Sequence, residues 1–331
     1  MEIDLVGVPL DCGKRRRGCV MGPEAYRVAG LAEALTALGH RVRDLGDVVP
    51  GPLPRVAGPD HLHALAEVSA WTAALITRGA EIEGLPIFLG GDHALSAGSV
   101  AGMAARAAAR QRPLFLLWLD AHSDFHTPWT TETGNLHGTP AAYVTGQPGF
   151  EAFPPLPALI PMSQVAMIGL RSVDPGERDR LAATNALLHD MRDVDEGGIA
   201  APVRRFLDRV AAAGGDLHVS LDVDFLDPSV APGVGTTVPG GRDVPRSASG
   251  HGAPERIRSG HLAGPGRVES GAGRARTDRR HDGQPHRIAV GPADLRSSHT
   301  GHGRASLTPL HGGPSGAIYG PCHWTNSLCC W

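Results

Sequence analysis

Two short apolar runs that end in acidic residues constrain the fold of this chain more than any other feature. Leu114–Leu119 is apolar throughout and precedes Asp120, and the mainly apolar residues 217–221 precede Asp222. Runs of this length and composition predict strands buried in the parallel sheet of an α/β protein. The carboxyl ends of such strands open into the crevice where ligands bind. We therefore expect these acidic residues to share one ligand site.

Three clusters of acidic and histidine side chains predict a metal centre. If each cluster stays extended, its alternating side chains share one face. Carboxylates held close together repel one another, and a divalent cation offsets that repulsion. The donors are oxygen and nitrogen without thiolate, which suits an ion such as Mn²⁺. A single Asp more often caps a helix, but three clusters together favour metal binding. They are Asp92-His93, Asp120-x-His122-x-Asp124 and Asp222-x-Asp224.

Up to about residue 241, short apolar strands alternate with amphipathic helical stretches. This rhythm predicts a three-layer α/β fold, in which helices cover both faces of a central, mostly parallel sheet. Besides the two runs above, we expect a first strand at the N-terminus and strands at 86–89 and 165–170. Helices are expected at 24–38, 97–110 and 203–213. Residues 1–241 form the predicted domain.

The composition excludes a few classes of protein and partner. The first residues lack the basic start and cleavage site of a secretory signal, and no apolar run approaches the length of a membrane span. The five cysteines form neither a disulfide framework nor a zinc pattern, so we expect a cytoplasmic location. The formal net charge of -3 indicates no particular partner.

The character of the chain changes abruptly in residues 242–331. This tail has twelve Arg, six acidic residues, no Phe and no apolar periodicity. Three interpretations compete: a disordered extension, an Arg-rich nucleic-acid-binding arm and translation in a shifted reading frame. Scattered arginines and scarce aromatic residues argue against nucleic acid. We favour the shifted frame, because GC-rich DNA read out of frame yields Arg, Gly, Pro, Ser and His without pattern.

Five ordered motifs within residues 3–241 resemble the ureohydrolase family and, within it, the arginases. The motifs at 134–140 and 169–177 favour arginases over agmatinase-like relatives. The resemblance implies a hydrolase of C–N bonds in linear amidines, which converts L-arginine to L-ornithine and urea. The motifs are Gly90-Gly-Asp-His-Ala-Leu-Ser96, Asp120-Ala-His-Ser-Asp-Phe-His-Thr127, Gly134-Asn-Leu-His-Gly-Thr-Pro140, Gly169-Leu-Arg-Ser-Val-Asp-Pro-Gly-Glu177 and Ser220-Leu-Asp-Val-Asp-Phe-Leu-Asp-Pro228.

The resemblance also implies two Mn²⁺ ions and a bridging hydroxide that attacks the guanidinium carbon. His137 would shuttle a proton to the leaving amine; the alternative is a structural loop histidine. Asp124 would be both a catalytic residue and a metal ligand. One ion would be held by His93, Asp120, Asp124 and Asp222, and the other by Asp120, His122, Asp222 and Asp224, so that Asp120 and Asp222 bridge.

Substrate contacts follow from the same resemblance. Thr133 and Asn135 would reach the α-carboxylate, and Asp174 and Glu177 would lie near the α-amino group. The alternative for Asp174 and Glu177 is capping of a helix that starts near Pro175. His126 stands where many family members have Asn, and this difference bears on carboxylate recognition.

The tail departs most from the family. No counterpart of the family's next helix, inner strand and late Glu is found after residue 241, so we expect poor folding or impaired activity. Other ureohydrolases remain alternatives, namely an agmatinase, a guanidinobutyrase or a formimidoylglutamase, as does a catalytically dead metal-binding homologue. The family implies a homo-oligomer, a trimer or a hexamer. We expect neither a nucleic-acid partner nor a membrane partner.

Overall fold

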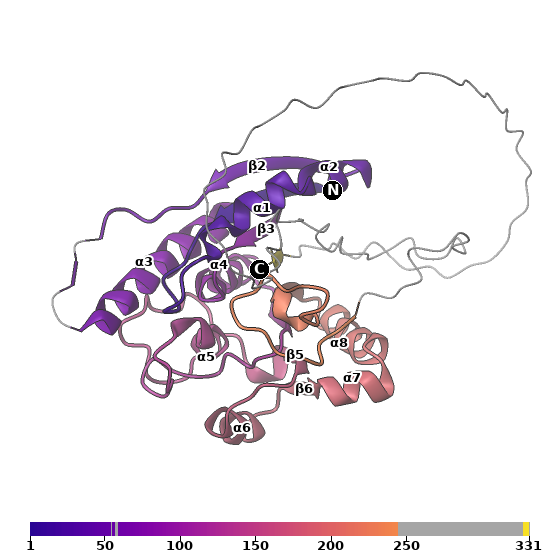
Figure 1. Ribbon diagram of the computed structural model, residues 1–331. Coiled ribbons are helices and arrows are strands. Elements are labelled where there is room, and N and C mark those ends of the chain that lie inside the picture. The colour runs from indigo at the N-terminus through magenta and orange to yellow at the C-terminus, as the bar shows by residue number, and fades with distance from the viewer. Residues whose placement is uncertain (54, 57–58, 244–326, 331) are drawn as a thin grey trace, which may run out of the picture. The chain divides into compact units, whose positions relative to one another are not determined.

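The computed structural model describes residues 1–53, 55–56, 59–243 and 327–330 (Figure 1). The chain divides into two units, and every described residue belongs to the unit made of 1–266 and 323–331. Most of the tail, for which disorder or a shifted reading frame was expected, lies outside the described residues. The domain boundary at residue 241 therefore stays a prediction.

An eight-stranded sheet with the order β2-β1-β3-β8-β7-β4-β5-β6 forms the centre of the fold. All of its pairings are parallel, and every residue of β4 and β5 is buried. The predicted parallel sheet is therefore confirmed. The strands are β1 (Glu2–Val8), β2 (Arg41–Asp47), β3 (Leu85–Gly90), β4 (Leu114–Leu119), β5 (Val165–Leu170), β6 (Leu187–Asp190), β7 (Asp216–Leu221) and β8 (Ser327–Cys330).

Helices cover both faces of this sheet, which confirms the three-layer architecture. Alternate residues of β4 point to opposite faces: Trp118 packs in a core with α3 to α5, whereas Leu117 packs in a second core with α7 and α8. Tyr26 and Leu31, from α1 and α2, pack on a third core against β1 and β3. The helices are α1 (Gly22–Val28), α2 (Leu31–Ala37), α3 (Asp60–Glu81), α4 (Leu95–Ala109), α5 (Pro140–Val144), α6 (Pro175–Ala182), α7 (Met191–Gly197) and α8 (Ala200–Ala212).

The single helix expected at 24–38 is wrong, because the chain forms two short helices there. Gly30 separates α1 from α2 and has a φ of 81°. Glycine adopts this left-handed conformation at little cost, and a helix cannot continue through it. The amphipathic pattern runs on across the break, which is why the sequence alone suggested one element.

The expectation that the tail supplies no inner strand is also wrong, for its last residues. β8 lies between β3 and β7, and its Leu328 is in register with Ile87 on one side and Val219 on the other. The interior backbone groups of β3 and β7 therefore find partners. No 2-residue period could be read in so short a run.

Replacing Leu328 with Pro tests whether β8 supports the sheet. Since β8 has a neighbour on both sides, loss of one backbone donor leaves a ladder group buried and unpaired, which costs about 1–3 kcal/mol. We expect the midpoint of urea unfolding to fall relative to Leu328→Ala, which keeps the donor. Equal midpoints for the two variants would contradict the pairing of β8.

Candidate metal centre

The ends of β3, β4 and β7 bring the expected ligands together. Asp120 follows β4 directly and Asp222 follows β7 directly, and the paired register of Leu119 with Leu221 sets them side by side. His93 comes from the turn after β3. Each ligand therefore starts from a buried strand, which restricts its position.

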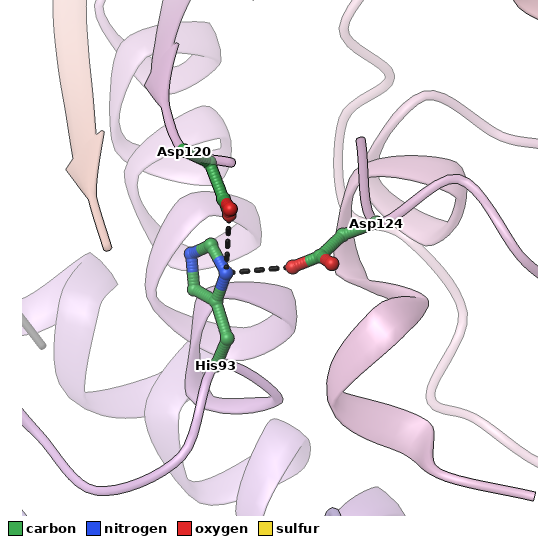
Figure 2. A group of neighbouring side chains, drawn as sticks. All are labelled: His93, Asp120 and Asp124. Atoms are coloured by element: carbon green, nitrogen blue, oxygen red, sulfur yellow. Dashed lines mark ion pairs between the residues drawn. The ribbon is translucent and has the colours of Figure 1, made fainter. Parts of the chain in front are cut away.

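A first cluster forms around one nitrogen of His93. Its Nδ1 lies 3.0 Å from Asp120 Oδ2, 2.6 Å from Asp124 Oδ2 and 3.4 Å from Asp222 Oδ2. Figure 2 shows Asp120 and Asp124 approaching this nitrogen from different directions. Asp124 Oδ2 is buried without a hydrogen bond of acceptable geometry. Several oxygens and a nitrogen that converge on one point fit the requirements of a bound cation better than those of paired donors and acceptors.

A second cluster shares Asp120 with the first. His122 Nδ1 lies 3.4 Å from Asp120 Oδ1 and 3.1 Å from Asp224 Oδ2. Asp120 thus offers Oδ2 to the first cluster and Oδ1 to the second. The ligand atoms of His93, Asp120 and Asp124 lie within 4.8 Å of one another, as do those of Asp120, His122 and Asp224. This donor set suits Mn²⁺.

The segments that carry these side chains do not stay extended, which was the condition for their alternating side chains to share one face. Asp124 has a φ of 48°, in the left-handed region, so the chain turns sharply after His122. Asp224 lies in the 3-10 turn Val223–Phe225, which Asp222 caps by accepting a hydrogen bond from Asp224 N (2.8 Å). Turns therefore gather the side chains that the alternating pattern only suggested.

Neighbouring side chains that the sequence did not single out orient the ligands. Trp118 Nε1 donates to Asp120 Oδ2 (3.1 Å), and the indole stacks on the His93 ring at 4.4 Å. His93 Nε2 is 3.0 Å from the hydroxyl of Ser220, which contacts Ser96. Such contacts fix ring orientation and tautomer in metal sites. The spacing of Trp118 and Ser220 from the ligands is the signal that could have indicated them. Trp118 lies two residues before Asp120 and Ser220 two residues before Asp222, so each shares a strand face with a ligand.

Burial and mutual repulsion raise the pKa of three carboxylates of the centre, and for Asp224 the causes are burial and then the charge of Asp120. Burial raises the pKa of Asp124 to about 7, and the charge of Asp120 adds to this. Burial, with the charges of Asp224 and Asp120, raises the pKa of Asp222 well above its ordinary value. Without cations, the centre therefore holds protons in their place.

Hydrogen-bonding partners of opposite charge shift the pKa of His122 and of Asp120. Burial opposes charge on His122, but its hydrogen bonds to Asp120 and Asp224 outweigh burial and raise its pKa to about 12. Burial likewise works against ionised Asp120, yet hydrogen bonds from His122 and His93 keep the pKa of Asp120 below its ordinary value. Asp120 is thus the carboxylate that stays ionised between both clusters.

His137 lies at the same cavity as the clusters. A cavity of about 440 Å³ is lined by His93, His137, Asp222 and Asp224 together with the loop that carries Lys14. Burial and the charges of the neighbouring histidines lower the pKa of His137 to about 4. The imidazole is therefore neutral at physiological pH.

The expected substrate residues form two groups. His126 Nε2 lies 2.9 Å from Asp174 Oδ2 and 3.6 Å from Glu177 Oε2. Asp174 and Glu177 also form a capping box at the start of α6, so the capping interpretation holds for both. Separately, Asn135 N donates to Thr133 Oγ1 (3.2 Å). Roles in substrate binding stay predictions for all five residues.

Comparisons with known proteins give one family. A family model described as "Arginase family" matches residues 1–264. The arginase of Brucella melitensis is 54% identical over 245 residues, which cover 73% of this chain and 80% of that protein. The arginase of Agrobacterium fabrum is 52% identical over 241 residues, covering 72% and 74%. The structure of Bacillus caldovelox arginase matches with a TM-score of 0.64 at 35% identity, covering 72% and 81%. Within the described residues, no helix is long and apolar enough to cross a membrane.

The response of the metal-free protein to pH tests the electrostatics. The pKa of Asp124 is about 7 in the folded state and 3.8 ordinarily, so its contribution to stability is present below pH 3.8 and lost as pH rises through 7. Cations replace the lost protons at high pH. We expect Mn²⁺ to raise the melting temperature more at pH 8 than at pH 5.5.

Asp124→Asn should make the Mn²⁺-induced rise in melting temperature more similar at pH 8 and pH 5.5, because Asn cannot ionise and is a poor ligand. Asp208→Asn, an exposed acid on α8, is the matched control and should behave as the unaltered chain. A Mn²⁺ effect that is equal at both pH values in the unaltered chain would contradict the electrostatic argument.

Proposed function

Because the chain belongs to the arginase family, we propose that it hydrolyses L-arginine to L-ornithine and urea with two Mn²⁺ ions. The single observation that carries the proposal is the pair of clusters that share Asp120, since its two oxygens face different histidines. Sequence identity of 54% to a protein named arginase favours L-arginine over other guanidino compounds as substrate.

The ions would be held by the six side chains expected from the sequence. When bound, two Mn²⁺ ions would lower the pKa of a water so that it ionises near neutral pH, and would stabilise the charge of the oxygen that adds to the guanidinium carbon. The chain itself supplies the ligand geometry, with Asp120 as the shared carboxylate. Asp222 lies 3.4 Å from His93 of the first cluster, and Asp224, two residues later, lies 3.1 Å from His122 of the second. This position between the clusters supports Asp222 as the second bridging carboxylate. One ion would be held by His93, Asp120, Asp124 and Asp222, and the other by Asp120, His122, Asp222 and Asp224.

His137 would move the proton that the leaving amine needs. A pKa lowered to about 4 makes the neutral imidazole of His137 a weak proton acceptor but, once protonated, a strong donor, so it favours release of the proton to the amine rather than its uptake. Its loop is fixed at the cavity, since His137 N and Leu136 N both donate to Gly13 O.

Two groups of side chains would bind the amino-acid end of the substrate. Asn135 Oδ1 accepts a hydrogen bond from Arg15 N (3.1 Å), so its amide NH₂ is left to donate to a carboxylate. Thr133 lies beside it. Asp174 is 63% exposed and offers its negative charge to an ammonium group, with Glu177 buried behind it. His126, close to both acids, would adjust the position of this end of the substrate.

Urea release from L-arginine and from agmatine tests the proposal. Agmatine lacks the α-carboxylate, so an enzyme that reads this group should prefer L-arginine by at least about tenfold in kcat/KM. Equal rates, or a preference for agmatine, would identify a different ureohydrolase. Bound Mn²⁺ without hydrolysis of either compound would identify a catalytically dead homologue. Because the family's late Glu has no counterpart in the described residues, we expect turnover below that of a frame-restored chain.

His137→Asn tests the proton shuttle. We expect kcat to fall by about 10²–10⁴-fold while the Mn²⁺ content per chain stays the same, because general acid–base catalysis contributes on this scale. His61→Asn, at an exposed position of α3, should leave both quantities unchanged. An unaffected kcat in His137→Asn would return His137 to the role of a structural loop residue. The homo-oligomeric state and the cytoplasmic location stay predictions.

A further inference from the structure

We propose that His126, Asp174 and Glu177 form a third site for a divalent cation such as Zn²⁺, which shares no ligand with the two clusters above. Their ligand atoms lie within 4.8 Å of one another. His126 Nε2 is 2.9 Å from Asp174 Oδ2 and 3.6 Å from Glu177 Oε2. Ligand atoms about 2.0–2.1 Å from a tetrahedral Zn²⁺ are separated by about 3.3 Å, so small rotations fit the triad to the ion.

The three residues come from two separate parts of the chain. His126 follows the sharp turn at Asp124, and Asp174 and Glu177 stand at the first turn of α6 after β5. The histidine and the acids are 48 positions or more apart in sequence. Their convergence is therefore a product of the tertiary fold rather than of local chain geometry.

Hydrogen bonds already orient two of the proposed ligands. His126 Nδ1 is 3.3 Å from Thr130 Oγ1, so a neutral ring can donate there and keep its Nε2 lone pair for a cation. Glu177 Oε1 accepts from Ser123 Oγ (2.7 Å) and Phe125 N (2.8 Å). Glu177 Oε2 accepts a hydrogen bond from Asp174 N (3.1 Å) and lies 3.6 Å from His126 Nε2, so it has a further lone pair for a cation. His126 and Glu177 are thus oriented before a cation arrives, whereas the exposed Asp174 side chain is free to adjust to it.

Charge and access favour a divalent ion. One neutral imidazole and two carboxylates carry a charge of two minus, which a divalent cation balances. One nitrogen and two oxygens, without thiolate, suit Zn²⁺ or Co²⁺ with water in the remaining position. The Asp174 side chain is 63% exposed, so the ion can enter from solvent, whereas Glu177 is 5% exposed and forms the base of the site.

Occupation of this site should inhibit the reaction, a consequence that rests on the proposed function. The two acids would otherwise face the α-amino group of L-arginine. A cation bound to them removes their negative charge and repels the ammonium group. Inhibition should therefore raise the apparent KM for L-arginine more than it lowers kcat.

Counting metals in the full chain tests the site without relying on activity. The chain is loaded with Mn²⁺ and titrated with Zn²⁺, and both metals are counted in the same samples after gel filtration. We expect one Zn²⁺ per chain in addition to retained Mn²⁺. If Zn²⁺ only replaces Mn²⁺ one for one, the proposal is wrong, even when the chain hydrolyses L-arginine as proposed.

Matched variants locate the additional ion. His126→Asn and Asp174→Asn should each weaken the additional Zn²⁺ at least tenfold while Mn²⁺ is retained; Asn at 174 can still cap α6. His189→Asn alters a surface pair with Asp193 (3.7 Å) and should leave Zn²⁺ binding unchanged. Additional Zn²⁺ that survives both site variants would place the ion elsewhere and overturn the assignment. In both site variants, Zn²⁺ should no longer raise the apparent KM for L-arginine above the variant's own zinc-free KM.

Discussion

Repulsion among four carboxylates that the sheet holds together is the constraint on which this structure depends. Asp120, Asp124 and Asp224 are buried, and Asp222 is largely so. Carboxylates this close cannot all ionise in a region of low polarity unless positive charge lies between them. Protons on the acids and histidines supply it in the metal-free chain, and two cations would supply it at neutral pH. The same repulsion that destabilises the empty centre therefore favours the binding of divalent ions.

The sheet withstands this repulsion because the surrounding residues leave the ligands little freedom. Trp118 is fully buried in the core and also donates to Asp120, so packing and ligand orientation depend on one side chain. At Gly169, φ is 99° and an added Cβ would lie 2.4 Å from the ring of Phe225. The turn that carries Asp224 can therefore pack directly on the end of β5. Arg171 donates to the carbonyl oxygens of Asp224 and Val238 and secures this turn further.

The sequence predicted the structure correctly where the residue types and the apolar pattern indicate the same element. The strand Leu114–Leu119 was predicted to the residue, because an apolar run between polar ends has little alternative. The six expected ligand residues also lie close together, Asp222 by its 3.4 Å approach to His93, although their role as ligands stays a prediction. Prediction from the sequence failed where a single residue decides the backbone. Gly30 breaks an amphipathic pattern that continues across it, and the left-handed turn at Asp124 leaves no trace in an alternating motif. β8 could not be predicted, because a short inner strand depends on its neighbours rather than on its own pattern.

The Mn²⁺ content of Asp120→Asn, beside that of Asp124→Asn, tests the central claim most directly. Two ions per chain are expected for the unaltered protein after dialysis against micromolar Mn²⁺. Asp120 faces both clusters and Asp124 only one, so Asp120→Asn should lose both ions, whereas Asp124→Asn should keep one. Two ions retained in Asp120→Asn would contradict the account, because Asp120 would then not be the carboxylate that the two ions depend on.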